Sequence, residues 1–364
     1  MNKVYCIGCG LVTPVGNTPA GVFEAVREGR TALGMHEGWP EPFYASLLER
    51  AGYDGPSFLE HIALRAAEAA LADAGVETAT PRTGLVFSSI KGNIDKIGQA
   101  DVSLAASASR LARALGIRTA PVVVSNACIS GLAALLQGMR MIRSGAYDRV
   151  LVVGAEVQSR FIVTGFQSLK ALSQKPCRPF DAEREGLNLG EAAAAMLLSG
   201  CHSGRSEESL WELVGGAVRN DANHISGPSR TGEGSYNALR VALEGITPEK
   251  LAFVNVHGTA TRYNDQMEAV ALNRAGLQDV PVNALKGIFG HTMGAAGVLE
   301  SIVSMQACDA GVVLPTRGFS TMGVDPGVSV SAGERKTDKK AFVKLLSGFG
   351  GVNAALLLRK GGAR

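Results

Sequence analysis

The sequence predicts an α/β protein in which helices cover a buried β-sheet. Apolar runs typical of β-strands alternate with amphipathic helical patterns along the chain, and several of these runs are continuous, as in strands buried on both faces. The chain has 364 residues, 46% of them hydrophobic, and can therefore bury a large core. We expect two domains or two fused halves, each built from α/β layers.

The first half opens with an apolar stretch, residues 4–11, that predicts a strand. A helix at 60–74 and a second strand at 85–88 follow. Cys6 and Cys9 form a C-x-x-C pattern, which occurs in redox and zinc sites. Because no second pair or histidine cluster stands at ligand spacing, an ordinary apolar strand is the better interpretation.

The second half continues the alternation of helix and strand. It predicts a helix, an apolar strand that ends at His257, and another helix, at residues 236–243, 253–256 and 266–275. A charged link containing Gly and Ser, residues 199–209, separates the halves. We therefore place the boundary near residue 205, between a half at 1–205 and a half at 206–364. No sequence repeat is strong enough to prove duplication.

Composition excludes several classes of protein. The 36 Lys and Arg against 33 Asp and Glu are too balanced for a protein wrapped in nucleic acid. No charged segment leads into an apolar stretch with a cleavage site, and no run of 18 apolar residues occurs. The six cysteines are scattered, unlike a disulfide scaffold. We expect a cytoplasmic protein with reduced thiols that binds neither membranes nor nucleic acid.

Cys128 lies between a predicted strand, residues 121–124, and a predicted helix. One face of that helix carries Ile129, Leu132, Leu136 and Met139. The free amides and the positive dipole end at a helix start favour the thiolate, which is the form that attacks a carbonyl. Taken alone, such a cysteine is more often a small buried hydrophobic residue.

Two histidines, His257 and His291, lie in glycine-bounded turns that directly follow apolar segments. An imidazole in such a turn can donate to an oxyanion or accept a proton, although a structural histidine is an equally good interpretation. Lys286 precedes His291 by five residues and Glu300 follows it by nine. A surface ion pair is the default interpretation of these charges. Near a catalytic histidine, they would instead set its protonation state.

A glycine-dense loop near the C-terminus, residues 347–353, joins two apolar segments. Its free amides suit an oxyanion site, because glycines let the backbone approach a substrate closely. A plain hairpin turn is the competing explanation.

Taken in order, these segments resemble the β-ketoacyl-[acyl carrier protein] synthases, the condensing enzymes of fatty-acid and polyketide synthesis. The segments that carry the resemblance are residues 7–16, 126–131 around Cys128, 178–181 (Arg-Pro-Phe-Asp), 257–259, 290–291 and the Gly-Phe-Gly-Gly loop. The resemblance implies a thiolase-like, five-layered αβαβα fold of two similar halves. It also implies a homodimer, or a heterodimer with a related subunit, and no cofactor or metal.

The same resemblance assigns site residues. Cys128 would accept an acyl chain from an acyl carrier protein, and His257 and His291 would assist decarboxylation of the malonyl extender. Lys286 would lie beside His291, paired with Glu300. The resemblance places the chain in the elongating Cys-His-His class, because thiolases, initiating synthases and chain-length factors differ at these positions.

The resemblance also assigns roles in the loop at residues 347–353, and the sequence differs from the family pattern there. The amides of Cys128 and Phe349 would form the oxyanion hole, and Phe349 would also act as a gate. Ser347 stands where the family usually has Phe, and Val352 where it usually has Thr. Two regions, residues 32–53 and 91–119, are shorter than in relatives.

Three functions follow from these residues. The leading one is an acyltransferase, a 3-oxoacyl-[acyl carrier protein] synthase that performs decarboxylative Claisen condensation in fatty-acid or polyketide/polyene-type biosynthesis. The alternative is a non-catalytic or weakly catalytic partner subunit of a heterodimeric ketosynthase. The third is a cysteine hydrolase or an acyltransferase with another acceptor. Arg140, Arg143 and Arg149 are candidates for docking an acidic carrier protein, although solvated helix-end charges explain them as well.

Overall fold

The structure, a computed structural model, describes residues 3–39, 41–76, 80–201 and 204–362. Within these residues the main sheet has ten strands in the order β11-β10-β14-β15-β9-β1-β8-β6-β4-β5. The strands of its first half are β1 (Tyr5–Val12), β4 (Thr83–Ser88), β5 (Val122–Val124), β6 (Arg149–Glu156) and β8 (Ala192–Ser199). Those of its second half are β9 (Trp211–Asn220), β10 (Phe253–Asn255), β11 (Val282–Asn283), β14 (Ala341–Gly348) and β15 (Val352–Lys360).

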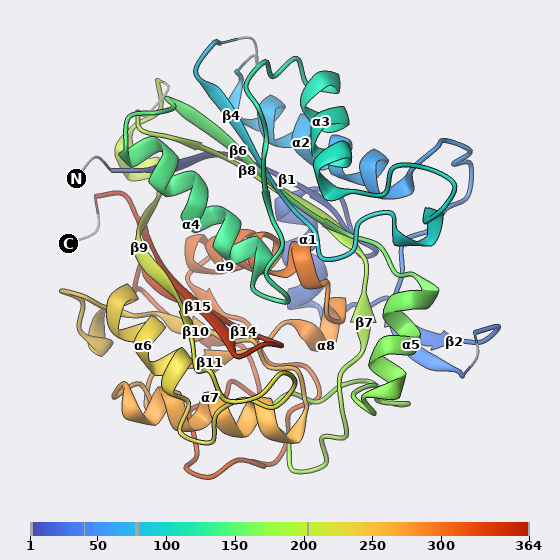
Figure 1. Ribbon diagram of the computed structural model, residues 1–364. Coiled ribbons are helices and arrows are strands. Elements are labelled where there is room, and N and C mark those ends of the chain that lie inside the picture. The colour runs from blue at the N-terminus through green and yellow to red at the C-terminus, as the bar shows by residue number, and fades with distance from the viewer. Residues whose placement is uncertain (1–2, 40, 77–79, 202–203, 363–364) are drawn as a thin grey trace.

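The helices form three layers around the two halves of this sheet (Figure 1). One outer layer holds α2 (Phe58–Ala74) and α3 (Leu104–Ala114), and the other holds α6 (Glu233–Ala242) and α7 (Arg262–Arg274). Between the half-sheets lie α1 (Pro19–Arg27), α4 (Ser130–Arg143) and α9 (Ala296–Asp309), whose apolar side chains pack against both. The predicted five-layered αβαβα fold is thus confirmed.

The two halves have the same topology. Their strand orders, β1-β8-β6-β4-β5 and β9-β15-β14-β10-β11, correspond strand for strand in chain order. The halves join where β1 pairs with β9, through Tyr5 opposite Glu212 and Cys6 opposite Trp211. This correspondence reveals the internal repetition that the sequence alone leaves unproven. The boundary near residue 205 stays a prediction.

Smaller elements lie around the layers. They are α5 (Arg160–Ser168), α8 (Lys286–Phe289), the strands β2 (Leu33–His36), β3 (Phe43–Ser46), β7 (Leu189–Gly190), β12 (Val312–Val313) and β13 (Arg335–Lys336), and four short 3₁₀ turns, η1 (Ile94–Lys96), η2 (Glu207–Ser209), η3 (Pro248–Lys250) and η4 (Met293–Ala295). Within the described residues, no helix is both long and apolar enough to span a membrane.

The expected elements are present, with shifts of a few residues at their ends. The C-x-x-C pattern lies in β1, as the strand interpretation predicts, and Cys6 Sγ contacts Cys9 Sγ at 3.3 Å. Residues three apart on a regular strand point to opposite faces. An irregularity in the pairing of β1 between Cys6 and Gly8 accounts for the two thiols meeting.

Backbone contact between α4 and α9 brings the starts of these helices together. A Cβ atom on Gly131 would lie 2.8 Å from the carbonyl oxygen of Gly294, and one on Gly297 would lie 2.2 Å from the amide nitrogen of Leu132. Any larger side chain would force the two helices apart. The glycines therefore hold the turn before α4 next to the turn before α9, where Cys128 and His291 lie.

Candidate active site

A strained turn presents Cys128 at the start of α4. Ala127, just before it, has a φ of 45°, in the left-handed region that non-glycine residues rarely adopt. Ser130 stabilises the turn, since its Oγ accepts from Asn126 N at 2.7 Å and donates to Ala127 O at 2.6 Å. Strain of this kind persists where surrounding contacts enforce it, and it is frequent at functional sites.

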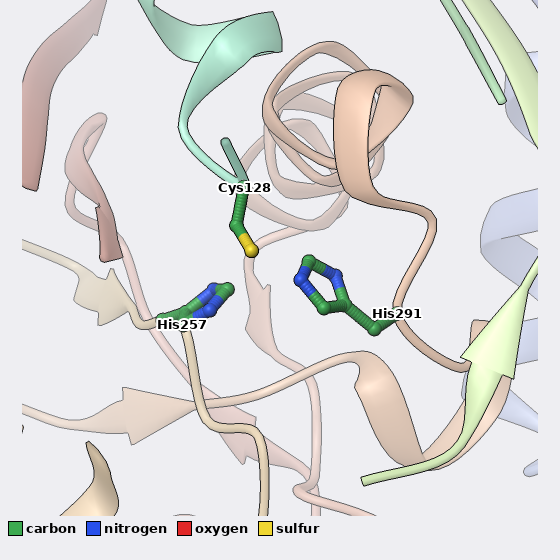
Figure 2. A group of neighbouring side chains, drawn as sticks. All are labelled: Cys128, His257 and His291. Atoms are coloured by element: carbon green, nitrogen blue, oxygen red, sulfur yellow. The ribbon is translucent and has the colours of Figure 1, made fainter. Parts of the chain in front are cut away.

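Cys128, His257 and His291 meet in one buried cluster (Figure 2). The cysteine Sγ and one nitrogen of each imidazole all lie within 4.8 Å of one another. The two rings are 5.0 Å apart between centroids, with an interplanar angle of 81°. His257 follows β10 and His291 lies between α8 and α9, so three separate segments supply the cluster.

The hydrogen bond at His291 fixes its tautomer. The amide of Met293 donates to Nδ1 at 3.2 Å, so in the neutral ring the proton is on Nε2. Nε2 is buried and has no hydrogen-bond partner among the described residues, which leaves it available to a substrate. The spacing of the cluster would also suit a Cys-His-His metal site, but a protonated Nε2 has no lone pair to offer a metal ion. The tautomer therefore favours hydrogen-bond donation.

Both imidazoles are held neutral. Burial, and next the nearby ammonium of Lys286, lower the pKa of His257 and of His291 well below the ordinary value of 6.5. Neutral imidazoles donate N–H groups without carrying positive charge. The pair thus suits stabilisation of an oxyanion or enolate.

The thiol of Cys128 differs from the sequence-based expectation. Burial raises its pKa to about 11, although Lys286 and the backbone amides of Phe349 and of Cys128 itself act in the opposite direction. The helix-start argument therefore identifies real stabilising groups, but desolvation outweighs them, and the prediction of a resting thiolate is wrong. At neutral pH the resting group is the thiol.

This protonation state predicts how Cys128 reacts with iodoacetamide. Because only the thiolate is alkylated, the rate of labelling should still be rising at pH 9, below the pKa of about 11. Mass spectrometry of the Cys128 peptide measures that rate, with the exposed Cys201 as an internal reference. A plateau near neutral pH would indicate a thiolate–imidazolium pair and contradict the neutral site.

The loop between β14 and β15 closes over Cys128. A Cβ on Gly348 would lie 3.0 Å from the amide nitrogen of Cys128, so the backbones are nearly in contact. The hairpin interpretation of this loop is correct, and the hairpin also places the Phe349 amide near the cysteine sulfur. Phe349 is 37% exposed, and its ring stacks on that of Phe166 in α5, with 5.7 Å between the ring centroids.

A cavity of about 480 Å³ reaches Cys128 and both histidines. Its other lining residues include Phe166, Leu187, Thr259, Ser347, Phe349 and Asn353. Two exposed basic residues, Lys170 and Arg262, also line it. Ser347 thus borders the same space as the nucleophile candidate.

Lys286 and Glu300 form an ion pair of 2.8 Å in which each side chain is 1% exposed. The default interpretation of a surface pair is therefore wrong. Although burial raises the pKa of Glu300, the ammonium groups of Lys286 and Lys344 outweigh it and hold that pKa below its ordinary value. The pair holds the ammonium of Lys286 near the histidines.

Sequence reasoning missed four charged residues near the cluster: Glu156, Asp265, Glu268 and Lys344. Glu268 binds the amides of His257 and Gly258 at 2.7 and 2.8 Å. Glu156 accepts from Gly294 N at 3.1 Å, in the turn before α9. Each of the four is fully or almost fully buried. A lysine in the middle of the apolar run before the closing loop is a signal that could have been recognised.

The three arginines proposed for carrier docking do not line the cavity. Arg143 ends α4, a helix of 14 residues or about 21 Å, at the opposite end from Cys128. Its guanidinium donates to the carbonyls of Leu213 and Val214 at 3.3 and 2.8 Å. Arg140 lies one turn before it, and Arg149 begins β6. The helix-end interpretation therefore fits Arg140 and Arg143, whereas Arg149 lies at the start of a strand.

Comparison with known proteins gives one consistent family. Residues 56–202 match the family model "Beta-ketoacyl synthase, N-terminal domain", and residues 210–320 match "Beta-ketoacyl synthase, C-terminal domain". The 3-oxoacyl-[acyl-carrier-protein] synthase 2 of Vibrio cholerae is 29% identical, over 98% of this chain and 99% of the relative.

Solved structures agree with the family models. A beta-ketoacyl synthase from Burkholderia phymatum superposes with a TM-score of 0.88 and 27% identity, over 99% of this chain and 100% of that one. A ketosynthase from Xenorhabdus doucetiae, solved in complex with its chain length factor, has a TM-score of 0.87 at 24% identity. The alignment covers 99% of this chain and 98% of that one, and it supports the shared fold.

Proposed function

The chain belongs to the beta-ketoacyl synthase family, and we propose that it is a 3-oxoacyl-[acyl carrier protein] synthase, an acyltransferase that forms carbon–carbon bonds. The proposal rests on one observation: a thiol and two neutral imidazoles lie close together, buried, beside the cavity. A thiol can hold an acyl chain as a thioester, and paired N–H donors can stabilise an enolate.

In the first step, Cys128 Sγ attacks the thioester carbonyl of an acyl carrier protein. A general base takes the thiol proton as the C–S bond forms, which the raised pKa of Cys128 requires. The amides of Cys128 and Phe349 stabilise the oxyanion, since both lie near the sulfur. The intermediate then collapses, and the carrier thiolate leaves and takes up a proton.

In the second step, malonyl-carrier protein loses CO2 and leaves an enolate of the thioester. His291 donates its Nε2 proton in a hydrogen bond to the enolate oxygen, and His257 supplies the second donor. The surroundings of the cluster are buried, so these hydrogen bonds face little competition from water. Burial and the ammonium groups of Lys286 and Lys344 keep the imidazoles neutral, and Glu300 pairs with both lysines.

In the third step, the enolate carbon attacks the acyl carbonyl on Cys128. The new C–C bond forms, the bond from the carbonyl carbon to Sγ breaks, and Cys128 leaves as a thiolate that is protonated again. The products are a 3-oxoacyl-carrier protein, CO2 and the free enzyme. Phe349, at the cavity beside Phe166, is the gate that admits the acyl chain.

We also propose the partners and the internal division of the chain. An acidic acyl carrier protein docks at the cavity mouth, where Lys170 and Arg262 are exposed. The protein works as a homodimer or with a related subunit. Residues 1–205 carry the nucleophile, and residues 206–364 carry both histidines.

The histidine variants test this assignment. His257→Ala and His291→Ala should each lower CO2 release from malonyl-carrier protein by about 10²- to 10³-fold, the usual effect of removing one oxyanion donor. Release of ¹⁴CO2 measures decarboxylation, and mass spectrometry of the carrier-bound product measures condensation. His36→Ala is the matched control, because that histidine lies in β2 outside the cluster. Wild-type decarboxylation in both variants would remove the histidines from the mechanism.

A non-catalytic partner subunit is the second candidate, motivated by Ser347 and by the solved ketosynthase that is paired with a chain length factor. The position of Cys128 against both histidines favours the catalytic function instead. Labelling of Cys128 with a thiol-directed acylating inhibitor, in the complex with the related subunit, distinguishes a catalytic subunit from a non-catalytic one. An unreactive Cys128 there would support the partner subunit, as would failure of the wild type to condense.

A further inference from the structure

Lys344 is a buried cation in the middle of an apolar strand. It belongs to β14, and its side chain is fully buried. The neighbours two residues away on either side, Phe342 and Leu346, face the central core, whereas Val343 and Leu345 face the outer one. By this alternation Lys344 points inward, toward α9 and the site. Burying an ammonium is costly unless it is paired, so the lysine calls for an explanation by its contacts.

The first contact of Lys344 is the carboxylate of Glu300. Nζ lies 2.5 Å from Glu300 Oε2, while Lys286 Nζ lies 2.8 Å from Oε1 of the same group. One anion thus serves two buried cations. Burial lowers the pKa of Lys344 to about 8, and Glu300 only partly offsets this effect.

The second contact ties Lys344 to His257. Nζ donates to the carbonyl oxygen of Val256 at 3.2 Å. The amide of His257, which belongs to the same peptide group, donates to Glu268 Oε1 at 2.7 Å. The peptide that precedes the histidine is therefore held at its oxygen by a lysine and at its nitrogen by a glutamate.

We propose that Lys344 is a positioning residue for the condensation: it fixes the peptide that carries His257 and, through Glu300, the ammonium of Lys286 near both histidines. The inference rests on the proposed function and adds a residue that the Cys-His-His cluster alone does not include. Lys344 contributes positive charge as well as geometry, and this charge disfavours protonation of both imidazoles.

Several ionisable groups share this environment, and each of them can affect the titration of His257 and His291. Those near the two imidazoles in the described residues are Cys128, Glu156, Asp265, Glu268, Lys286 and Glu300. Burial raises the pKa of Glu156 and of Glu268 to about 7, and that of Asp265 to about 6. Replacing Lys344 also changes the surroundings of its partner Glu300, so the resonances of His257 and His291 are followed individually rather than the titration of the whole protein.

The test compares Lys344→Met with Lys344→Gln, which keeps a donor for the Val256 carbonyl but loses the charge. Histidine side-chain NMR of the full-length protein, without substrate, follows the protonation of His257 and His291. Loss of a nearby cation makes protonation easier, so in both variants it should begin at a pH higher by roughly one unit. Lys336→Met, at an exposed lysine of β13, is the control and should titrate like wild type.

Activity provides the second measurement. Turnover of Lys344→Met should fall roughly tenfold to a hundredfold, as expected for small displacements of a catalytic group. The acidic limb of its pH–rate profile should move to higher pH, a shift that a merely structural role would not cause. Unchanged histidine titration in both Lys344 variants would overturn the proposal, and if Lys344→Met does not fold, Lys344→Gln decides it. A wild type that fails to condense would overturn the proposed function instead, because the titration needs no substrate.

Discussion

Replacing Cys128 with Ala is expected to lower condensation by at least about a thousandfold, as removal of a covalent nucleophile does in other enzymes. The acyl chain then has no sulfur to occupy, and the new C–C bond cannot form on the enzyme. Loss of CO2 from malonyl-carrier protein should remain measurable, because the donors for the enolate are on His257 and His291. Separate assays of CO2 and of the 3-oxoacyl product resolve the two effects.

Cys201→Ala is the matched control for this variant. Cys201 is an exposed cysteine outside the cavity, so its replacement should leave both reactions unchanged. Condensation at the wild-type rate in the Cys128→Ala protein would show that the nucleophile is wrongly assigned. Equal loss of decarboxylation and condensation would indicate instead that the thiol helps to bind the malonyl group.

Replacing Glu300 with Gln is expected to lower the free energy of unfolding by about 3–5 kcal/mol, the range found when one partner of a buried ion pair is removed. The change leaves Lys286 and Lys344 buried without their shared anion. Denaturant melts at neutral pH measure the loss. Glu334→Gln is the control, because its pair with Arg27 is 34% and 43% exposed, and such a pair contributes at most about 1 kcal/mol.

The dependence on pH makes this prediction more specific. The folded protein holds the pKa of Glu300 below 4.5, so its ionisation contributes stability that is fully present above that value. The contribution is lost as the pH falls through the lower, folded-state pKa. The difference in unfolding free energy between wild type and Glu300→Gln should therefore narrow in acid. A small, pH-independent difference, like that of Glu334→Gln, would contradict a structural role for the shared carboxylate.

The sequence predicts the layers and the three central residues well, because each depends on local pattern. Apolar runs and helical spacing are enough to place Cys128 before a helix and His257 after a strand. Burial is different, since it depends on contacts between segments that are far apart in the chain. Glu300 and Lys344 are 44 residues apart, and only the fold shows that they meet.

The same limit explains the two incorrect interpretations. The helix start before α4 does supply amides near Cys128, but a sequence gives no measure of desolvation, which dominates the pKa of this thiol. A surface ion pair is predicted for Lys286 and Glu300 because most pairs of this kind lie on surfaces. Lys344 is the exception, since a lysine inside a continuous apolar strand pattern is recognisable from sequence.

The contact between α4 and α9 bears on how this family diverges. Main-chain atoms set the spacing of the two helices at Gly131 and Gly297, so the separation of Cys128 from His291 does not depend on which side chains fill the core around them. Side chains at neighbouring core positions can then change while the starts of the two helices keep their spacing. Drift of this kind is consistent with a TM-score of 0.88 at only 27% identity.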